Sequence, residues 1–197
     1  MSDMTVRIAG IAPFIMHSQR LANALDPEVK ELKALVAKKD KDKTDADRAQ
    51  IQEMEWRLGL YLDEELRPCI PSRVVNACLV QGARKFKLGK QVESGGIFLA
   101  EASTPVIYRG PKDIDKLWDS GKYRLDTMVK RPPRTGALVL ATRPVFNEWE
   151  ADLNLHTDPT KLNEDQILNI VRKAGADIGM GDWRPQHGRF EVISHAA

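Results

Sequence analysis

Alternating apolar and polar positions predict β-strands at the start and in the second half of the chain. The opening run 5–18 places Val6 and Ile8 two positions apart, and Pro13 restricts a strand to the residues before it or to a sheet edge. In 148–156 apolar residues occupy every second position. That pattern is typical of a strand with one face buried and the other in solvent.

Helical spacing of apolar residues predicts two core helices. The first spans 71–87, with Ser72 as its expected N-cap. The second spans 160–179 and is the clearest helix of the chain. Asn163 and Gln166 have the spacing of a capping box in front of its apolar stripe.

The segment 26–58 has the pattern of a helical hairpin. Asp26 is placed to cap a first helix that has Pro27 in its first turn, and a second helix is expected over about 45–58. The stretch 38–47 between the helices is almost wholly charged. We interpret the hairpin as a solvated, charged insertion.

The remaining segments alternate between strand and turn patterns, with a short helix within 112–126. Strands are expected in 60–71, 95–110, 137–146 and 189–193. Without the insertion, the order is strand–helix–strand–strand–helix–strand. This order predicts an α+β, ferredoxin-like (RRM-like) fold, with an antiparallel sheet and helices on one face. We expect a single domain, 1–197, with the helical insertion 26–58 and a basic projecting segment, 110–135.

Composition limits the classes of function. The chain has 30 Lys and Arg, 28 Asp and Glu, a formal net charge of +2 and 42% hydrophobic residues. No apolar run reaches about 18 residues and no signal-peptide pattern opens the chain, so we expect a cytoplasmic protein without a membrane segment. The 2 cysteines and 4 histidines lack metal-ligand spacing, so neither a metal nor another cofactor is expected.

The loop GMGDWRPQHGRF (179–190) concentrates glycine and arginine between the last helix and the last strand. Backbone N–H groups in such loops bind phosphate, Arg184 and Arg189 would add charge-assisted hydrogen bonds, and Trp183 would stack on a base. The composition therefore suits single-stranded nucleic acid. The structural alternative is a helix cap, a turn glycine and a core tryptophan. The loop has neither the Gly-Lys-Ser/Thr of a P-loop nor the preceding strand of a dinucleotide site.

Two further basic groups accompany this loop. One follows the end of the 71–87 helix, where cations also complement the helix dipole. Its members are Arg84, Lys85, Lys87 and Lys90. The other lies in a proline-broken segment that would clamp a nucleic-acid backbone, contact a neighbouring subunit or serve as an exposed linker. Its members are Lys130, Arg131 and Arg134.

Three segments resemble the RAMP superfamily, the repeat-associated ferredoxin-like proteins of CRISPR effector complexes. The 179–190 loop is similar to the family's glycine-rich loop in kind and position. RPCIPSRVVNACLVQGAR (67–84) resembles the segment in which a helix follows Ile-Pro and a small polar residue and ends in Ala-Arg. VRIAGIAPFIMHSQRLA (6–22) resembles the first strand and turn of backbone-type members. About half of the chain is covered; 26–58 has no counterpart, and Ser72 lacks the usual neighbouring Gly-Ser. Compact phage-encoded proteins also look similar.

The resemblance implies a non-catalytic subunit that holds single-stranded RNA of the guide type, or single-stranded DNA, within an oligomer or a multisubunit complex. The RNA path would follow the 71–87 helix, its basic end and the glycine-rich loop. The loop residues expected to bind are Gly179, Gly181, Trp183, Arg184, His187, Gly188 and Arg189.

Two other functions remain open. Some members of the resembled family are endoribonucleases with a catalytic histidine near the position of His17, so a metal-independent endoribonuclease using this residue is the first alternative. The second alternative is a phage structural or interaction protein that does not bind nucleic acid.

Overall fold

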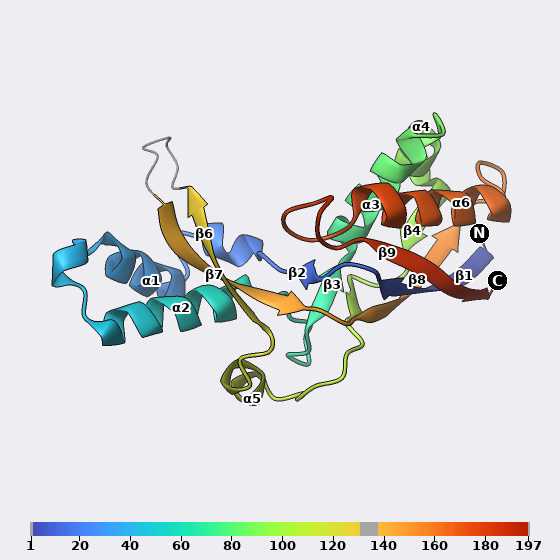
Figure 1. The fold of residues 1–197 in the computed structure, drawn as a ribbon. Helices are drawn as coiled ribbons and strands as arrows, with labels where there is room; N and C mark the ends of the chain where they lie inside the picture. The colour runs from blue at the N-terminus through green and yellow to red at the C-terminus, as the bar shows by residue number, and fades with distance from the viewer. Residues whose placement is uncertain (1, 131–137, 197) are drawn as a thin grey trace. The chain divides into compact units, whose positions relative to one another are not determined.

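The computed structural model describes residues 2–130 and 138–196, which form two compact units (Figure 1). The first unit comprises residues 2–15, 61–110 and 146–196. The second comprises residues 16–60 and 111–145, of which 131–137 lie outside the described residues. The two segments expected as appendages of one domain, 26–58 and the described part of 110–135, thus fall almost entirely within the second unit.

An antiparallel sheet forms the centre of the first unit. Among the described residues its strands lie in the order β4 (Ile97–Leu99), β8 (Glu150–Thr157), β1 (Ser2–Gly10) and β9 (Phe190–Ala196). The central strand β1 pairs with β8 and β9, and β4 pairs with β8. Every second residue of β8 is buried, which confirms the alternation in 148–156. The predicted α+β class is confirmed.

Two helices, α3 (Ser72–Arg84) and α6 (Glu164–Lys173), cover one face of this sheet (Figure 1). Along the chain, α3 lies between β1 and β4, and α6 connects β8 to β9. Leu79 of α3 and Ile170 of α6 are fully buried, as is Val6 on the inner face of β1. Apolar positions on the inner faces of the helices and the sheet therefore form one core.

The start of α6 is as the sequence predicts, whereas the start of α3 is not. Asn163 and Gln166 form the expected capping box, each side chain accepting the other residue's backbone N–H. In α3 the N-cap is Pro71, so the capping role of Ser72 is wrong. The Ser72 hydroxyl instead donates to the carbonyl oxygen of Glu101, because its backbone N–H also pairs with this segment at Ala102 (2.9 Å).

Short elements complete the first unit. They are β2 (Phe14–Ile15), β3 (Cys69–Pro71), β5 (Ser103–Pro105), α4 (Gly89–Gln91) and the π-helical turns Val92–Gly96 and Ala174–Ile178. β3 and β5 pair antiparallel, which confirms strands in 60–71 and 95–110. The helix predicted over 160–179 runs through α6 and the second π-helical turn, and Gly179 ends it as expected.

Trp149 fixes the chain at the end of β1. Its indole N–H donates to the carbonyl oxygen of Ala12 (2.9 Å), and its ring lies 5.3 Å from that of Phe14 and 6.3 Å from that of Phe190 between centroids. A Cβ on Gly10 would lie 2.1 Å from the indole nitrogen, so only glycine fits beside this ring. The contacts set the course of residues 10–15, on which a later loop rests.

The second unit combines a helical hairpin with a β-hairpin. Its elements are α1 (Pro27–Ala37), α2 (Asp45–Gly59), α5 (Ile114–Asp119), β6 (Arg124–Lys130), β7 (Leu138–Phe146, whose last residue belongs to the first unit) and the 3₁₀ turns Gln19–Ala22 and Asp40–Asp42. Asp26 caps α1, as predicted, and Thr44 caps α2. β6 and β7 pair antiparallel.

The helical hairpin is confirmed, and its helices also contribute to a buried core. Val29 and Leu32 of α1 pack with Leu58 of α2 in a buried cluster. Trp56 is fully buried, and its indole N–H donates to the carbonyl oxygen of Tyr123 (2.7 Å). The hairpin therefore shares a core with the residues that follow 110, and its charges cover only the outer faces of α1 and α2.

The described part of the expected projecting segment 110–135 contains α5, which confirms the short helix expected within 112–126, and β6. Lys130 ends β6, opposite Leu138 of β7. Arg131 and Arg134 lie outside the described residues. None of the described helices has the length and apolar character needed to cross a membrane.

The contact between α3 and the π-helical turn Ala174–Ile178 predicts a strict size limit at Gly82. A Cβ there would lie 2.7 Å from the Cβ of Ala174 and 2.9 Å from its backbone nitrogen. We expect Gly82→Val to lower the free energy of unfolding by about 3 kcal/mol through overpacking, measured by urea denaturation. The exposed Asn76→Val on the same helix is the control, and equal stability of the two variants would contradict this packing.

Candidate nucleic-acid interface

The 179–189 loop, between the second π-helical turn and β9, is built on close backbone contacts. Gly181 and Gly188 have positive φ values of 81° and 71°. A Cβ on Gly181 would lie 2.3 Å from the carbonyl oxygen of Ile15, and one on Gly188 would lie 1.7 Å from that of Met180. These glycines are therefore required by packing at the base of the loop.

The backbone amides of the loop are mostly used inside the protein. Gly188 donates to the carbonyl oxygen of Pro13 (2.7 Å), Asp182 to that of Ile15 (2.9 Å) and Met180 to that of Gly188 (2.9 Å). The expectation that these amides cradle phosphate is therefore corrected. The amides of Met180, Asp182 and Gly188 are thus not free to bind a ligand.

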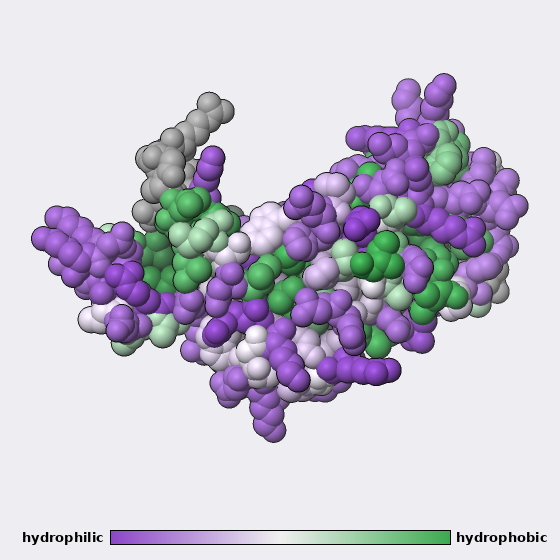
Figure 2. Space-filling view, viewed as in Figure 1, coloured by the Kyte–Doolittle hydropathy of each residue, from purple (hydrophilic) through white to green (hydrophobic). Residues whose placement is uncertain are grey.

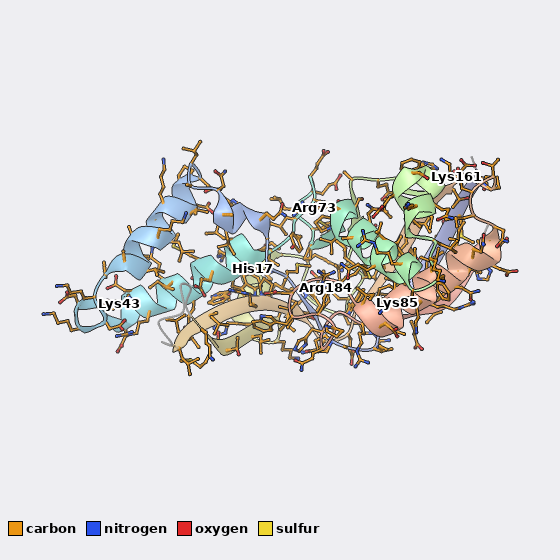
Figure 3. The ribbon with its side chains drawn as sticks, turned by 90° about the horizontal axis from the view of Figure 1, so that it is seen from above. His17, Lys43, Arg73, Lys85, Lys161 and Arg184 are labelled. Atoms are coloured by element: carbon orange, nitrogen blue, oxygen red, sulfur yellow. The ribbon has the colours of Figure 1, made fainter. Side chains whose placement is uncertain are left out.

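Arg184 is the most accessible cation of the loop. Its side chain is exposed and forms no ion pair with any described residue. It lies close enough to Tyr61 to influence its pKa, as does Arg73 at the start of α3. The Arg73 guanidinium carbon lies 5.7 Å from the centroid of the Tyr61 ring. Figure 3 labels Arg73, Arg184 and Lys85 along α3, with Arg73 in its first turn and Lys85 just past its end.

The electrostatics of this group follow from burial and from the two arginines. Burial raises the pKa of the Tyr61 hydroxyl, and the positive charges of Arg73 and Arg184 oppose that shift. Burial also raises the pKa of the Cys78 thiol to about 12, again against the charge of Arg184. Cys78 is therefore a core thiol without nucleophilic character at neutral pH, and Arg184 lies near the middle of α3.

Arg189 and His187 each leave a buried nitrogen unsatisfied. The Nε of Arg189 and the Nδ1 of His187 have no hydrogen-bond partner among the described residues. The carbonyl oxygen of Arg189 accepts the amides of Ile11 (2.9 Å) and Ala12 (3.2 Å), which fixes its backbone against β1. Buried donors without partners are rare in folded proteins. Both side chains thus keep unused hydrogen-bonding capacity at a buried nitrogen.

Trp183 is half-buried and does not belong to the buried core. Its backbone has φ of 54°, which is unusual for a bulky residue, and its N–H donates to the Asp182 carboxylate (3.1 Å). Beside it is an open hollow of about 460 Å³. The residues that line the hollow are Gln81, Asp177, Ile178, Gly181, Asp182, Trp183, Arg184 and Pro185.

The basic end of α3 extends the positive surface. Arg84 pairs with Glu93 (2.7 Å), so its charge is partly balanced. Lys85, Lys87 and Lys90 are exposed and have no ion pair in the described parts of the chain. Figure 2 shows a mostly hydrophilic surface over this region, in its upper right part. The cations expected in the 179–190 loop and at the end of the 71–87 helix therefore all belong to the first unit.

The open face of the sheet has the opposite charge. Asp3 and Arg7 of β1 point away from the helices, opposite His156 and Asp152 of β8. Arg7 is bound by Asp152 (2.7 Å), and the acidic side chains outnumber the arginine. These acids are Asp3, Glu150, Asp152 and Glu191. A polyanion is therefore disfavoured on the open face.

His17 and Lys130 belong to the second unit. His17 is exposed and lies within electrostatic range of Glu55 on α2. The carboxylate of Glu55 accepts the backbone N–H of Thr142 (2.9 Å), whose hydroxyl donates to Asp126 (2.8 Å). Burial raises the pKa of Glu55, against the charges of Arg143 and His17.

Sequence reasoning missed the residues that this fold adds to the site. Tyr61 and Arg73 are 12 positions apart in the sequence. They come into contact because the chain between them folds through β3 before α3 begins. Gln81 and Asp177 face the same hollow from two different helices. Arg73 and Gln81 stand within the 67–84 segment that the sequence already distinguishes, whereas Tyr61 and Asp177 lie outside it and outside the 179–190 loop.

No protein-family model matches the chain, and no curated protein matches it significantly. In the described ranges 2–130 and 138–196, no three side chains of His, Cys, Asp and Glu are grouped to hold a metal ion.

Glu55→Gln tests the buried carboxyl group. The amide keeps an acceptor for the Thr142 N–H and removes the charge. Because burial raises the folded-state pKa above the usual 4.5, ionised Glu55 destabilises the fold above that raised pKa and has little effect near pH 4. We expect a higher Tm for the variant at pH 7 and a nearly unchanged Tm at pH 4, in thermal melts followed by circular dichroism. The exposed Glu64→Gln is the control; an equal shift at both pH values would refute the assignment.

Proposed function

We propose that this chain binds single-stranded RNA without cleaving it, through side chains around α3 and the 179–189 loop. The supporting observation is the separation of charge within the first unit. Arg73 in the first turn of α3, Arg184 beside its middle and Lys85 at its end form a row of cations, whereas the open face of the sheet is acidic. Exposed cations without acidic partners are what phosphate groups bind.

The connectivity of the sheet supports a ferredoxin-like core. β8 lies between the two strands that α3 connects, β1 and β4, and β1 lies between the two strands that α6 connects, β8 and β9. This is a split βαβ arrangement made twice, as in ferredoxin-like folds. It agrees with membership of the RAMP superfamily, which we propose on this order and on the three resembling segments.

The binding mode follows from what each group offers. Arg73 and Arg184 would form charge-assisted hydrogen bonds with phosphate oxygens, and the lysines at the end of α3 would continue the track as point charges. Trp183 would stack on a base. Contacts of this kind hold the strand in place largely independently of its sequence. We further propose assembly with other copies or subunits along the RNA, as in the resembled family, in the cytoplasm.

A charge-reversal pair tests the binding surface. Arg184→Glu with Lys85→Glu changes two exposed residues that have no ion pairs among the described residues. We expect RNA affinity to fall at least tenfold at about 50 mM salt. The slope of log K against log salt should become shallower by about 1.4, because two phosphate contacts of a single strand are lost. Fluorescence anisotropy with labelled oligo-U over a salt series measures both.

Lys30→Glu with Lys33→Glu on α1 is the matched control. It makes the same change in net charge on exposed residues of the second unit. Equal loss of affinity in the two double variants would reject the proposed surface. Absence of binding by the parent protein at low salt would reject RNA binding and favour the interaction protein.

The environment of His17 favours one second candidate, a metal-independent endoribonuclease. An exposed histidine within electrostatic range of a carboxyl group with a raised pKa resembles an acid–base pair. On this candidate, labelled RNA incubated with EDTA would be cleaved, and His17→Ala would reduce the rate at least a hundredfold. Intact RNA after incubation with the parent protein, resolved by gel electrophoresis, is the outcome that our proposal expects.

A further inference from the structure

The hollow beside the 179–189 loop combines an aromatic residue with hydrogen-bonding side chains. Its volume of about 460 Å³ is ample for one nucleobase, and all of its lining residues belong to the first unit. Arg184 lies on its rim, so a nucleotide whose phosphate contacts that arginine would have its base at the hollow. We propose that the hollow binds guanine and gives the chain a preference for strands that contain it. The inference rests on the proposed RNA binding and adds base selection to it.

Trp183 supplies the stacking surface. The residue is half-buried, so its ring has a supported side and an accessible part. The bond from its backbone N–H to the Asp182 carboxylate (3.1 Å) holds the residue in its unusual backbone conformation. Asp182 is therefore a positioning residue. Stacking would bind any base, because every base has an aromatic face.

Asp177 is the residue that would distinguish guanine from the other three bases. Its carboxylate lines the hollow and pairs with Lys173 (2.8 Å) in an ion pair that is more than a third exposed at both ends. Such surface pairs are weak and exchange readily with another donor. The Watson–Crick edge of guanine has two adjacent donors, N1–H and N2–H, which match the two oxygens of a carboxylate. Uracil, adenine and cytosine each offer a single donor group beside an acceptor, which a carboxylate repels.

Gln81 completes the recognition from α3. Its side chain is exposed at the hollow, and no hydrogen bond to it is found in the described residues. The amide NH₂ would donate to O6 of guanine, next to the N1–H that Asp177 accepts. Single-stranded RNA is commonly read in this way, by stacking and by contacts to the Watson–Crick edge.

Four octanucleotides of equal charge test the inference: oligo-U and oligo-U with one internal G, A or C. Phosphate contacts are the same in all four, so differences in Kd measured by fluorescence anisotropy isolate the base. We expect the G-containing strand to bind about tenfold more tightly than the others, as a good bidentate pair provides. Asp177→Asn should reduce this preference below about twofold. Trp183→Ala should weaken all strands.

The control variant is Asp165→Asn on α6, an exposed aspartate outside the hollow, which should keep the preference. Equal affinity of the parent protein for the four strands would overturn the inference and leave RNA binding intact. A guanine preference that survives Asp177→Asn would overturn the role of that carboxylate. No binding of any strand would reject the proposed function itself. Circular dichroism confirms that each variant is folded.

Discussion

Main-chain hydrogen bonds between the 179–189 loop and the strand segment 13–15 determine what the first unit can offer a ligand. Gly188 donates to Pro13 and Asp182 donates to Ile15, and glycine at 181 and 188 lets these backbones touch. The base of the loop is therefore fixed, and the amides of Asp182 and Gly188 are satisfied before any ligand arrives. What remains at the surface are side chains, above all Trp183 and Arg184. The loop resembles a phosphate-binding loop in composition. On our proposal, its fixed backbone instead positions the Trp183 ring and the Arg184 guanidinium.

The same fold separates charges that nearly cancel in the sequence. A formal net charge of +2 suggests no polyanionic partner. In the first unit, however, β1 and β8 direct acids such as Asp152 to the open face of the sheet, while the cations around α3 and Arg184 lie elsewhere. A ligand with many phosphates is repelled by one face and attracted to the other. Distribution, rather than total charge, is what supports nucleic-acid binding here.

Local patterns predicted the elements, and long-range contacts decided the site. The alternation in β8 and the capping box of α6 depend on neighbours within a few residues, so they were visible in the sequence. The joint core of the second unit was not, because the bond from Trp56 to Tyr123 spans 67 positions. The hollow was missed for the same reason, since Gln81 and Asp177 meet only after α3 packs on the Ala174–Ile178 turn. The sequence showed that the loop is rich in glycine. In the structure, glycine at 181 and 188 allows close packing of the backbone.

The central claim is that single-stranded RNA contacts the α3 and loop side of the first unit and not the open face of its sheet. An NMR titration of the uniformly ¹⁵N-labelled chain with oligo-U tests it most directly, because every backbone amide reports its own surroundings. The account predicts the largest shift changes in 81–90 and 182–189, with Arg7 and Asp152 unaffected. Largest changes along β8 and β1, or no changes at low salt with excess RNA, would contradict it.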